Sequence, residues 1–306
     1  MNTYFVFSDI HGEYDKLMKA LDESGFDINN DSHIIISDGD LFDRGKKSKE
    51  CLDFVMSMLE KKRAIVIMGN HDLRLYDLMF KNKIPDRCDV HNGVPATINS
   101  FINAESSLFW FNEAYISSSM SEISYETKEK LYEYFMSALW YVENDGYIIT
   151  HGWLPTFDII RKLSGRYFSP KEHMEKWREA PYEDWYNAIW SDTKSLIYGM
   201  YHNDENYYNE DKKLIIGHFW ANELHTVFDN EVRKKYLEKQ KSTKSISPVL
   251  EKDNLIAIDG MSNLESTSIT YRDCDDNICA FEVQGKVNVY KFMSDKEFKG
   301  RKALGQ

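Results

Sequence analysis

The chain has 306 residues, of which 42% are hydrophobic, so it can bury a sizeable core in one large domain or two small ones. Its formal net charge of -12 disfavours binding to nucleic acid or to an anionic membrane surface. No apolar run reaches the about 18 residues that a membrane span needs, and the four cysteines lack a zinc-binding spacing. We therefore expect a cytoplasmic protein with free thiols that binds neither nucleic acid nor a membrane.

Three strand–loop–helix units follow one another at the start of the chain. Each begins with a short apolar run that reads as a buried strand: Thr3–Phe7, His33–Ile36 and Ala64–Met68. Each strand is followed by a polar loop and a segment with apolar residues at helical spacing. Such a succession predicts an α/β fold with parallel strands joined by right-handed crossovers. In such sheets functional side chains gather at the carboxyl ends of the strands.

The middle of the chain is less regular. Residues of about 83–144 contain chain-breaking Pro and Gly, and apolar spacing predicts a helix over Tyr125–Tyr141. We expect this stretch to be a helical cap inserted into the sheet domain. A second, aromatic-rich insertion covers about 157–210 and includes Trp177 and Trp185. Its aromatic side chains could stack on nucleotide bases, although packing within the cap is the more ordinary role.

Further strands are expected in the second half. Tyr147–Thr150 and Leu214–Ile216 each end in a Gly- and His-containing loop. The remaining apolar runs are close together, which favours antiparallel hairpins; they are Leu255–Ile258, Ser268–Tyr271, Ile278–Val283 and Val287–Phe292. The tail Lys299–Gln306 is expected to be frayed. We expect one domain over residues 1–306.

Polar side chains with ligand chemistry follow each of the first five expected strands: Asp9, His11, Asp40, Asp43, Arg44, Asn70, His71, His151 and His218. Crowded carboxylates repel one another unless a cation lies between them. Mixed carboxylate, imidazole and amide donors suit manganese, iron or zinc better than calcium. The set is large enough for two divalent ions that share one carboxylate.

In order along the chain, these residues form motifs that resemble the calcineurin-like metallophosphoesterase superfamily, and within it the phosphoprotein phosphatase branch of bacterial or phage type. The motifs are Asp9-Ile10-His11-Gly12, Gly39-Asp40-Leu41-Phe42-Asp43-Arg44-Gly45, Gly69-Asn70-His71-Asp72, His151-Gly152 and Gly217-His218, with Trp190-Ser191-Asp192 as a weaker signal. The resemblance implies a four-layer sandwich, in which helices flank a central β-sandwich and a dinuclear metal site lies on one rim.

The resemblance also implies roles for individual residues. Asp9, His11 and Asp40 would bind one ion, and Asp40, Asn70, His151 and His218 the other, with manganese as the first choice of metal. Arg44 would hold the phosphate, His71 would protonate the leaving oxygen, and Asp43 would fix the tautomer of His71. A water bridging the two ions would attack phosphorus in line.

The family usually adds a phosphate-binding arginine after the Trp-Ser-Asp element, but none lies between Asp192 and His218. Arg161 or Arg166 could take its place. The sequence interpretation is a phosphomonoester hydrolase, first a serine/threonine protein phosphatase, acting on a phosphorylated protein or a small phosphoester. A dinucleoside polyphosphate hydrolase is the alternative enzyme, followed by a phosphodiesterase or nuclease. A protein-binding scaffold on the same fold is the non-enzyme alternative.

Overall fold

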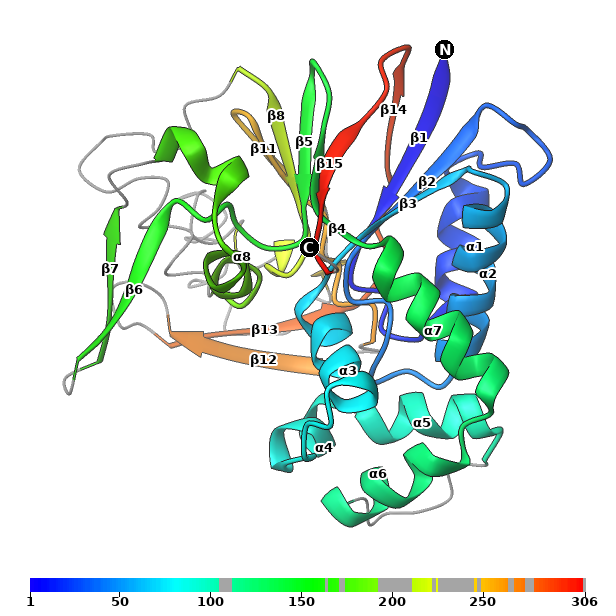
Figure 1. Ribbon diagram of the computed structural model, residues 1–306. Helices are drawn as coiled ribbons and strands as arrows, with labels where there is room; N and C mark the ends of the chain where they lie inside the picture. Colours follow the sequence, from blue (N-terminus) through cyan, green and yellow to red (C-terminus); the bar gives the residue numbers. More distant parts are fainter. Residues whose placement is uncertain are drawn as a thin grey trace.

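The structure is a computed structural model that describes residues 1–104, 112–162, 165–170, 174–191, 211–221, 224, 245–246, 249–263, 267–272 and 278–304. Asp192 of the Trp-Ser-Asp element lies outside these residues. Within them, one large mixed sheet forms the centre of the molecule (Figure 1). Its strands follow the order β10-β11-β8-β5-β4-β3-β2-β1-β14, and β15 pairs with β4.

The strands of this sheet are short. Their bounds are β1 Asn2–Phe7, β2 His33–Asp38, β3 Ala64–Ile67, β4 Leu139–Glu143, β5 Tyr147–Thr150, β8 Lys213–Ile216, β10 Leu250–Lys252, β11 Leu255–Ala257, β14 Tyr290–Ser294 and β15 Lys299–Lys302. The strands β1, β2 and β3 are parallel, as are β5, β8 and β11. The carboxyl ends of β1, β2, β3, β5 and β8 carry the loops that hold the predicted site.

Successive side chains along these strands point to opposite faces, and both faces are buried. On β1, Phe5 and Phe7 pack in the larger core cluster with residues of the helices, whereas Tyr4 and Val6 belong to a second cluster. This second cluster contains residues of β1–β3 and also of β4, β5, β8 and β11. It therefore lies between two halves of the same sheet.

The sheet can curl over this inner cluster because its two halves are joined weakly. The strands β3 and β4 pair only at Ile67 and Leu139. Val142 and Ile149 on one half then belong to the same buried cluster as Val6 and Ile36 on the other. The predicted α/β fold with a central β-sandwich is confirmed, with the addition that both halves belong to one continuous sheet.

Helices cover the outer face of the β1–β3 half. The helices α1, α2 and α7 lie along that half, and α4, α5 and α6 gather beneath α3 in Figure 1. Their bounds are α1 Tyr14–Glu23, α2 Ser48–Glu60, α3 Asn70–Phe80, α4 Arg87–Asn92, α5 Val94–Ile102, α6 Glu113–Ser119, the 3-10 helix η1 Met120–Glu122 and α7 Tyr125–Ser137. The contacts between α5 and α2 bring residues of the expected cap close to the loop that follows β2.

Several further elements lie outside the main sheet. They are the strand pair β6 Phe157–Lys162 and β7 Gly165–Pro170, the 3-10 helix η2 Met174–Glu179, the helix α8 Tyr182–Ile189, and the small sheet of β9 Ser245–Ile246, β12 Thr267–Arg272 and β13 Ile278–Gln284. In this region Trp185 is buried and stacks on Trp140 with 5.9 Å between ring centroids. Trp177 packs edge-on against Trp185. These indoles have a packing role.

Three expectations about individual elements were wrong. The helix expected over Tyr125–Tyr141 ends at Ser137, because the residues after it form β4, on which the successive side chains of Tyr141 and Val142 are buried in different core clusters. The tail was expected to be frayed, but β15 pairs with β4, and Ala303 and Leu304 are buried. The run that became β14 does not form a hairpin with β13; it pairs with β1, where Tyr4 stacks on Phe292. The run that became β11 does form an antiparallel hairpin, but with β10, which precedes it. The antiparallel pair β12–β13 is confirmed.

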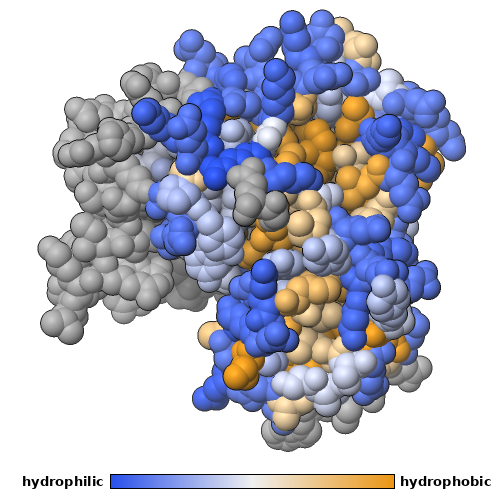
Figure 2. All heavy atoms as spheres, in the orientation of Figure 1, coloured by the Kyte–Doolittle hydropathy of each residue, from blue (hydrophilic) through white to orange (hydrophobic). Residues whose placement is uncertain are grey.

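The surface agrees with the polar composition. Hydrophilic residues dominate the upper and right-hand edges of the face in Figure 2, and apolar residues show mainly in a band nearer its centre. Over the described residues, no helix combines the length and the apolar character needed to cross a bilayer.

Candidate metal centre

The loops after β1, β2, β3, β5 and β8 bring the predicted residues together at one rim of the sheet. Asp9, His11, Asp40, Asn70 and His151 are all buried. Within these loops, six of the nine predicted site residues have a positive φ angle, a conformation that costs non-glycine residues of order 1–3 kcal/mol; they are Asp9, His11, Asp40, Asp43, Arg44 and His218. Packing of the loops against one another holds this strained arrangement.

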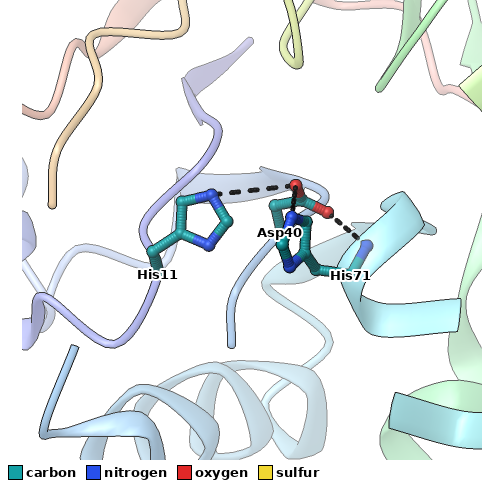
Figure 3. Close-up of side chains that lie close together, drawn as sticks. All are labelled: His11, Asp40 and His71. Carbon is teal, nitrogen blue, oxygen red and sulfur yellow. Dashed lines mark hydrogen bonds and ion pairs between the residues drawn. The ribbon is translucent and has the colours of Figure 1, made fainter. Parts of the chain in front are cut away.

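Asp40 lies at the centre of the cluster. Its Oδ2 is 3.8 Å from Nε2 of His11 and 4.0 Å from Nε2 of His71, and its Oδ1 is 3.3 Å from Nε2 of His151. Figure 3 shows the rings of His11 and His71 turned toward the Asp40 carboxylate. Among the described residues, two groups of side chains could each hold a metal ion: His11, Asp40 and His71, and Asp40, His151 and His218. Asp40 belongs to both.

The remaining predicted ligands lie beside these groups. Oδ1 of Asn70 is 3.0 Å from Nε2 of His151. Oδ2 of Asp9 accepts hydrogen bonds from the Ser8 hydroxyl at 2.5 Å and from the His218 backbone at 2.9 Å. A side chain at Gly217 would have no room, because its Cβ would lie 2.6 Å from Oδ2 of Asp9. Close approach of the loops after β1 and β8 therefore requires glycine there.

Each of the three histidines predicted to be metal ligands has one ring nitrogen bonded to a backbone carbonyl. Nδ1 of His11 bonds to the carbonyl of Phe42, and Nδ1 of His151 to that of Asp38, each at 2.8 Å. Nε2 of His218 bonds to the carbonyl of Ser191, also at 2.8 Å. A ring that donates through one nitrogen leaves the other nitrogen as a free electron-pair donor, which is how metal-binding histidines are usually oriented. The donor set fits divalent transition metals.

The buried histidines and carboxylates of the cluster shift one another's pKa values. Burial lowers the pKa of His11 well below its usual value, and burial with the nearby His151 lowers the pKa of His218 to about 4. Burial also lowers the pKa of His151, but the carboxylates of Asp40 and Asp9 raise it well above the usual value. Burial would raise the pKa of Asp40, but His151 and His71 hold it well below its usual value. The lowered pKa values favour neutral rings at His11 and His218, which leave an electron pair for a metal, whereas the raised pKa of His151 favours its cationic form as long as no metal is bound.

The predicted acid pair and arginine are also in contact. Nδ1 of His71 donates to Oδ2 of Asp43 at 2.8 Å. The Arg44 guanidinium donates to Nε2 of His11 at 2.8 Å and to Nε2 of His71 at 3.1 Å. Burial lowers the pKa of His71, but the carboxylates of Asp40 and Asp43 outweigh it and raise the pKa above its usual value. All nine predicted residues therefore lie in one connected cluster.

Sequence reasoning missed two groups that support this cluster. The Asp72 carboxylate accepts backbone N–H bonds from Asp40 at 2.9 Å and Leu41 at 3.0 Å, which fixes the loop after β2. Its place beside Asn70 and His71 could have suggested such a role. The Ser262 hydroxyl donates to the backbone carbonyls of Asp9 and Ile10. Ser262 follows β11 in no recognisable motif, and only the fold brings it to the site.

Known proteins provide independent information. A model of the calcineurin-like phosphoesterase family matches residues 3–242. The asymmetrical bis(5'-nucleosyl)-tetraphosphatase PrpE of Halalkalibacterium halodurans is 33% identical over 99 residues, which cover 30% of this chain and 39% of that protein. The symmetrical bis(5'-nucleosyl)-tetraphosphatase of Pasteurella multocida is 42% identical over 92 residues, covering 29% of this chain and 32% of that protein. This chain thus matches less than half the length of either relative.

A solved metallophosphoesterase structure from Sphaerobacter thermophilus is also similar, with 14% sequence identity, a TM-score of 0.35, and coverage of 93% of this chain and 88% of that one. The family match spans every strand end that contributes to the cluster, from β1 to β8. The chain therefore belongs to the calcineurin-like phosphoesterase family.

Proposed function

We propose that this chain hydrolyses dinucleoside polyphosphates such as diadenosine tetraphosphate, with two divalent transition-metal ions as cofactors. The observation that carries the metal part is the position of Asp40 in both metal-type groups. The substrate part is supported by the tetraphosphatase names of the two relatives reported above. This substrate is the alternative in the sequence interpretation, and we now rank it before a phosphorylated protein, the substrate of a serine/threonine phosphatase.

In this proposal, Asp9, His11 and Asp40 hold one ion, and Asp40, Asn70, His151 and His218 hold the other. Such a pair of ions, when bound, supplies a hydroxide-like nucleophile at neutral pH and offsets phosphoryl charge. The protein orients the ligands beforehand, because backbone carbonyls already fix the rings of His11, His151 and His218. Little reorganisation then remains for the reaction itself.

Arg44 is assigned the role of phosphoryl clamp, a side chain that binds the phosphoryl oxygens of the substrate. Its two terminal nitrogens reach the imidazoles of His11 and His71, which places a fixed positive charge at the two rings that face Asp40. A phosphoryl group offers oxygen acceptors with a stronger charge than an imidazole nitrogen, so Arg44 would exchange these bonds for bonds to the substrate. Nε2 of His71 then loses its donor and is free to hold a proton.

His71 and Asp43 form the proton-donating pair. The carboxylate of Asp43 accepts the Nδ1 proton, so a second proton would sit on Nε2, facing the centre. His71 gives that proton to the leaving oxygen. This pair also favours a second candidate function, a serine/threonine protein phosphatase. A serine alkoxide is a strong base and needs a proton to leave, whereas a nucleotide phosphate leaves with less assistance.

A direct comparison of substrates tests the proposal. Purified protein with manganese is given diadenosine tetraphosphate, a phosphoserine peptide and bis(4-nitrophenyl) phosphate, and kcat/KM is measured for each. The expected order places diadenosine tetraphosphate first and the diester last. Chromatography of the nucleotide products then distinguishes symmetrical cleavage to two ADP from asymmetrical cleavage to ATP and AMP. A higher kcat/KM on the peptide would replace the proposal by the second candidate function.

A further inference from the structure

A buried hydroxyl touches the acid pair from outside the family motifs. Thr97 lies in the first part of α5 and is fully buried. Its Oγ1 is 2.7 Å from the backbone nitrogen of Asp43, 3.2 Å from Oδ1 of Asp43, and 3.2 Å from Oγ of Ser48. Ser48 is the first residue of α2 and is also buried. The loop after β2, the start of α2 that follows it, and the distant helix α5 thus meet at one oxygen atom.

The directions of these hydrogen bonds follow from the chemistry of the groups. A backbone N–H can only donate, so the Thr97 oxygen accepts from Asp43. An ionised carboxylate can only accept, so the single hydroxyl proton of Thr97 goes to Oδ1 of Asp43. Ser48 is then the donor in its contact with Thr97. The hydroxyl of Thr97 is fully used, and both oxygens of the Asp43 carboxylate are held, one by Thr97 and one by His71.

The start of α5 and the glycine just before it also hold the backbone of the loop. Asp43 and Arg44 have φ angles of 73° and 67°, which L residues rarely adopt. The N–H of Asp43 is bonded by Thr97, and the N–H of Arg44 donates to the carbonyl of Gly93 at 3.3 Å. Loss of the Thr97 hydroxyl would therefore leave a buried N–H and a buried carboxylate oxygen without a partner.

We propose that Thr97 is a positioning residue that acts through Asp43 on His71. By fixing the plane of the Asp43 carboxylate, it keeps Nδ1–H of His71 bonded and Nε2 directed at the leaving group. Groups that orient metal-binding imidazoles and carboxylates typically contribute about 10–100-fold to metal affinity or activity, and we expect an effect of the same order on this catalytic imidazole. The inference rests on the proposed role of His71 as the general acid.

The test replaces the hydroxyl while keeping the shape. Thr97→Val is close in volume and lacks the oxygen, and Thr97→Ser keeps it. The substrates are a matched pair of esters, one of phenol and one of 4-nitrophenol. Both are esters of phosphate or both are esters of ADP, whichever of these groups the enzyme accepts. Phenolate is the stronger base and depends more on the acid. We expect Thr97→Val to lose about 10–100-fold in kcat on the phenyl ester and only about threefold on the nitrophenyl ester. Thr97→Ser should recover most of the loss.

A double-mutant cycle separates this inference from the proposed function. In a His71→Asn background, Thr97→Val should have no further effect on the phenyl ester, because its influence passes through His71. Metal content by elemental analysis should be unchanged in every variant. Should Thr97→Val not fold, Thr97→Cys replaces it, since sulfur is a weak hydrogen-bonding partner.

Two outcomes would overturn different claims. If His71→Asn loses the same factor on both esters, His71 is not the acid, and the proposed mechanism fails at that step. If His71→Asn is selective for the phenyl ester but Thr97→Val is not, the mechanism stands and the role of Thr97 is refuted. Loss of metal from Thr97→Val would also refute it.

Discussion

The backbone N–H of His218 donates a hydrogen bond of 2.9 Å to Oδ2 of Asp9, a residue 209 positions earlier in the chain. This bond joins the loop after β1 to the loop after β8. The carboxylate of one proposed ion site is thereby fixed by the backbone of a ligand of the other. We therefore expect that a change at one ion site also alters ion binding at the other.

Replacing Asp40 by Asn should weaken both ion sites. Its carboxylate is the one shared by the two donor groups, and an amide provides no negative charge between two cations. Wild-type protein should hold close to two transition-metal ions per chain by elemental analysis and lose activity to chelators. Asp40→Asn should hold fewer than one. The matched control is Asp53→Asn, which changes a carboxylate paired with Lys49 and Lys130 on the outside. Two ions retained by Asp40→Asn would contradict the shared role.

Replacing His71 by Asn should spare metal binding and slow the chemistry. Its Nδ1 is engaged by Asp43, so the ring is directed by a carboxylate and not by a backbone carbonyl as in the other histidines. General acid catalysis typically contributes about 10²–10⁴-fold. We expect a loss in that range on a phosphoserine peptide, a much smaller loss on an aryl phosphate, and unchanged metal content. A metal-depleted variant would show instead that His71 is a ligand.

Metal binding should weaken as the pH falls. In the metal-free protein the carboxylates of Asp40 and Asp9 outweigh burial and raise the pKa of His151 well above its usual value, which favours the cationic ring. A metal ligand must be unprotonated, and binding of an ion therefore releases a proton. The affinity should fall by roughly tenfold per pH unit below that pKa and level off above it. Calorimetric titrations in buffers of different ionisation enthalpy measure the released protons. Identical heats in all buffers would disprove the coupling.

Replacing Gly93 by Ala should displace Arg44. Gly93 has a φ angle of 89°, and a Cβ there would lie 2.4 Å from the Arg44 backbone nitrogen. Gly25 provides the matched control, since its φ is 79° but its Cβ would meet only the Lys291 amine at 3.5 Å. Gly25→Ala should cost about 1 kcal/mol of unfolding free energy from backbone strain alone. Gly93→Ala should cost more and should also raise KM, which denaturant unfolding and steady-state kinetics measure. An unchanged KM would argue against Arg44 as the phosphoryl clamp.

The part of the fold that could be predicted is the part encoded locally. The buried strands β1, β2, β3, β5 and β8 are short apolar runs followed by polar loops, and each was placed correctly to within about two residues. The end of α7 and the start of β4 could not be placed, because Leu139 continues the helical spacing of Leu131 and Phe135. The role of β15 was hidden for another reason. Its sequence Lys-Gly-Arg-Lys is polar, and only pairing with β4 makes it a strand.

The residues of the site also divide into those that the sequence predicts and those that only the fold reveals. The proposed ligands could be found because each follows a strand directly, and strand ends converge in a parallel sheet. The groups that orient them could not, since carbonyls such as that of Ser191 have no sequence signature. Thr97 and Ser262 are ordinary hydroxyl residues, and what they do depends on contacts across 54 and 253 positions.

The bond between Asp9 and His218 also bears on how the protein is made. Synthesis proceeds from the N-terminus, so the carboxylates of Asp9 and Asp40 leave the ribosome long before His218 does. Until β8 inserts beside β5, the loop after β1 lacks the N–H that satisfies Asp9. Contacts this distant in sequence form late and slow the folding of a chain. Capture of the second ion would thus mark the completion of folding, and a nascent chain short of residue 218 should hold at most one ion.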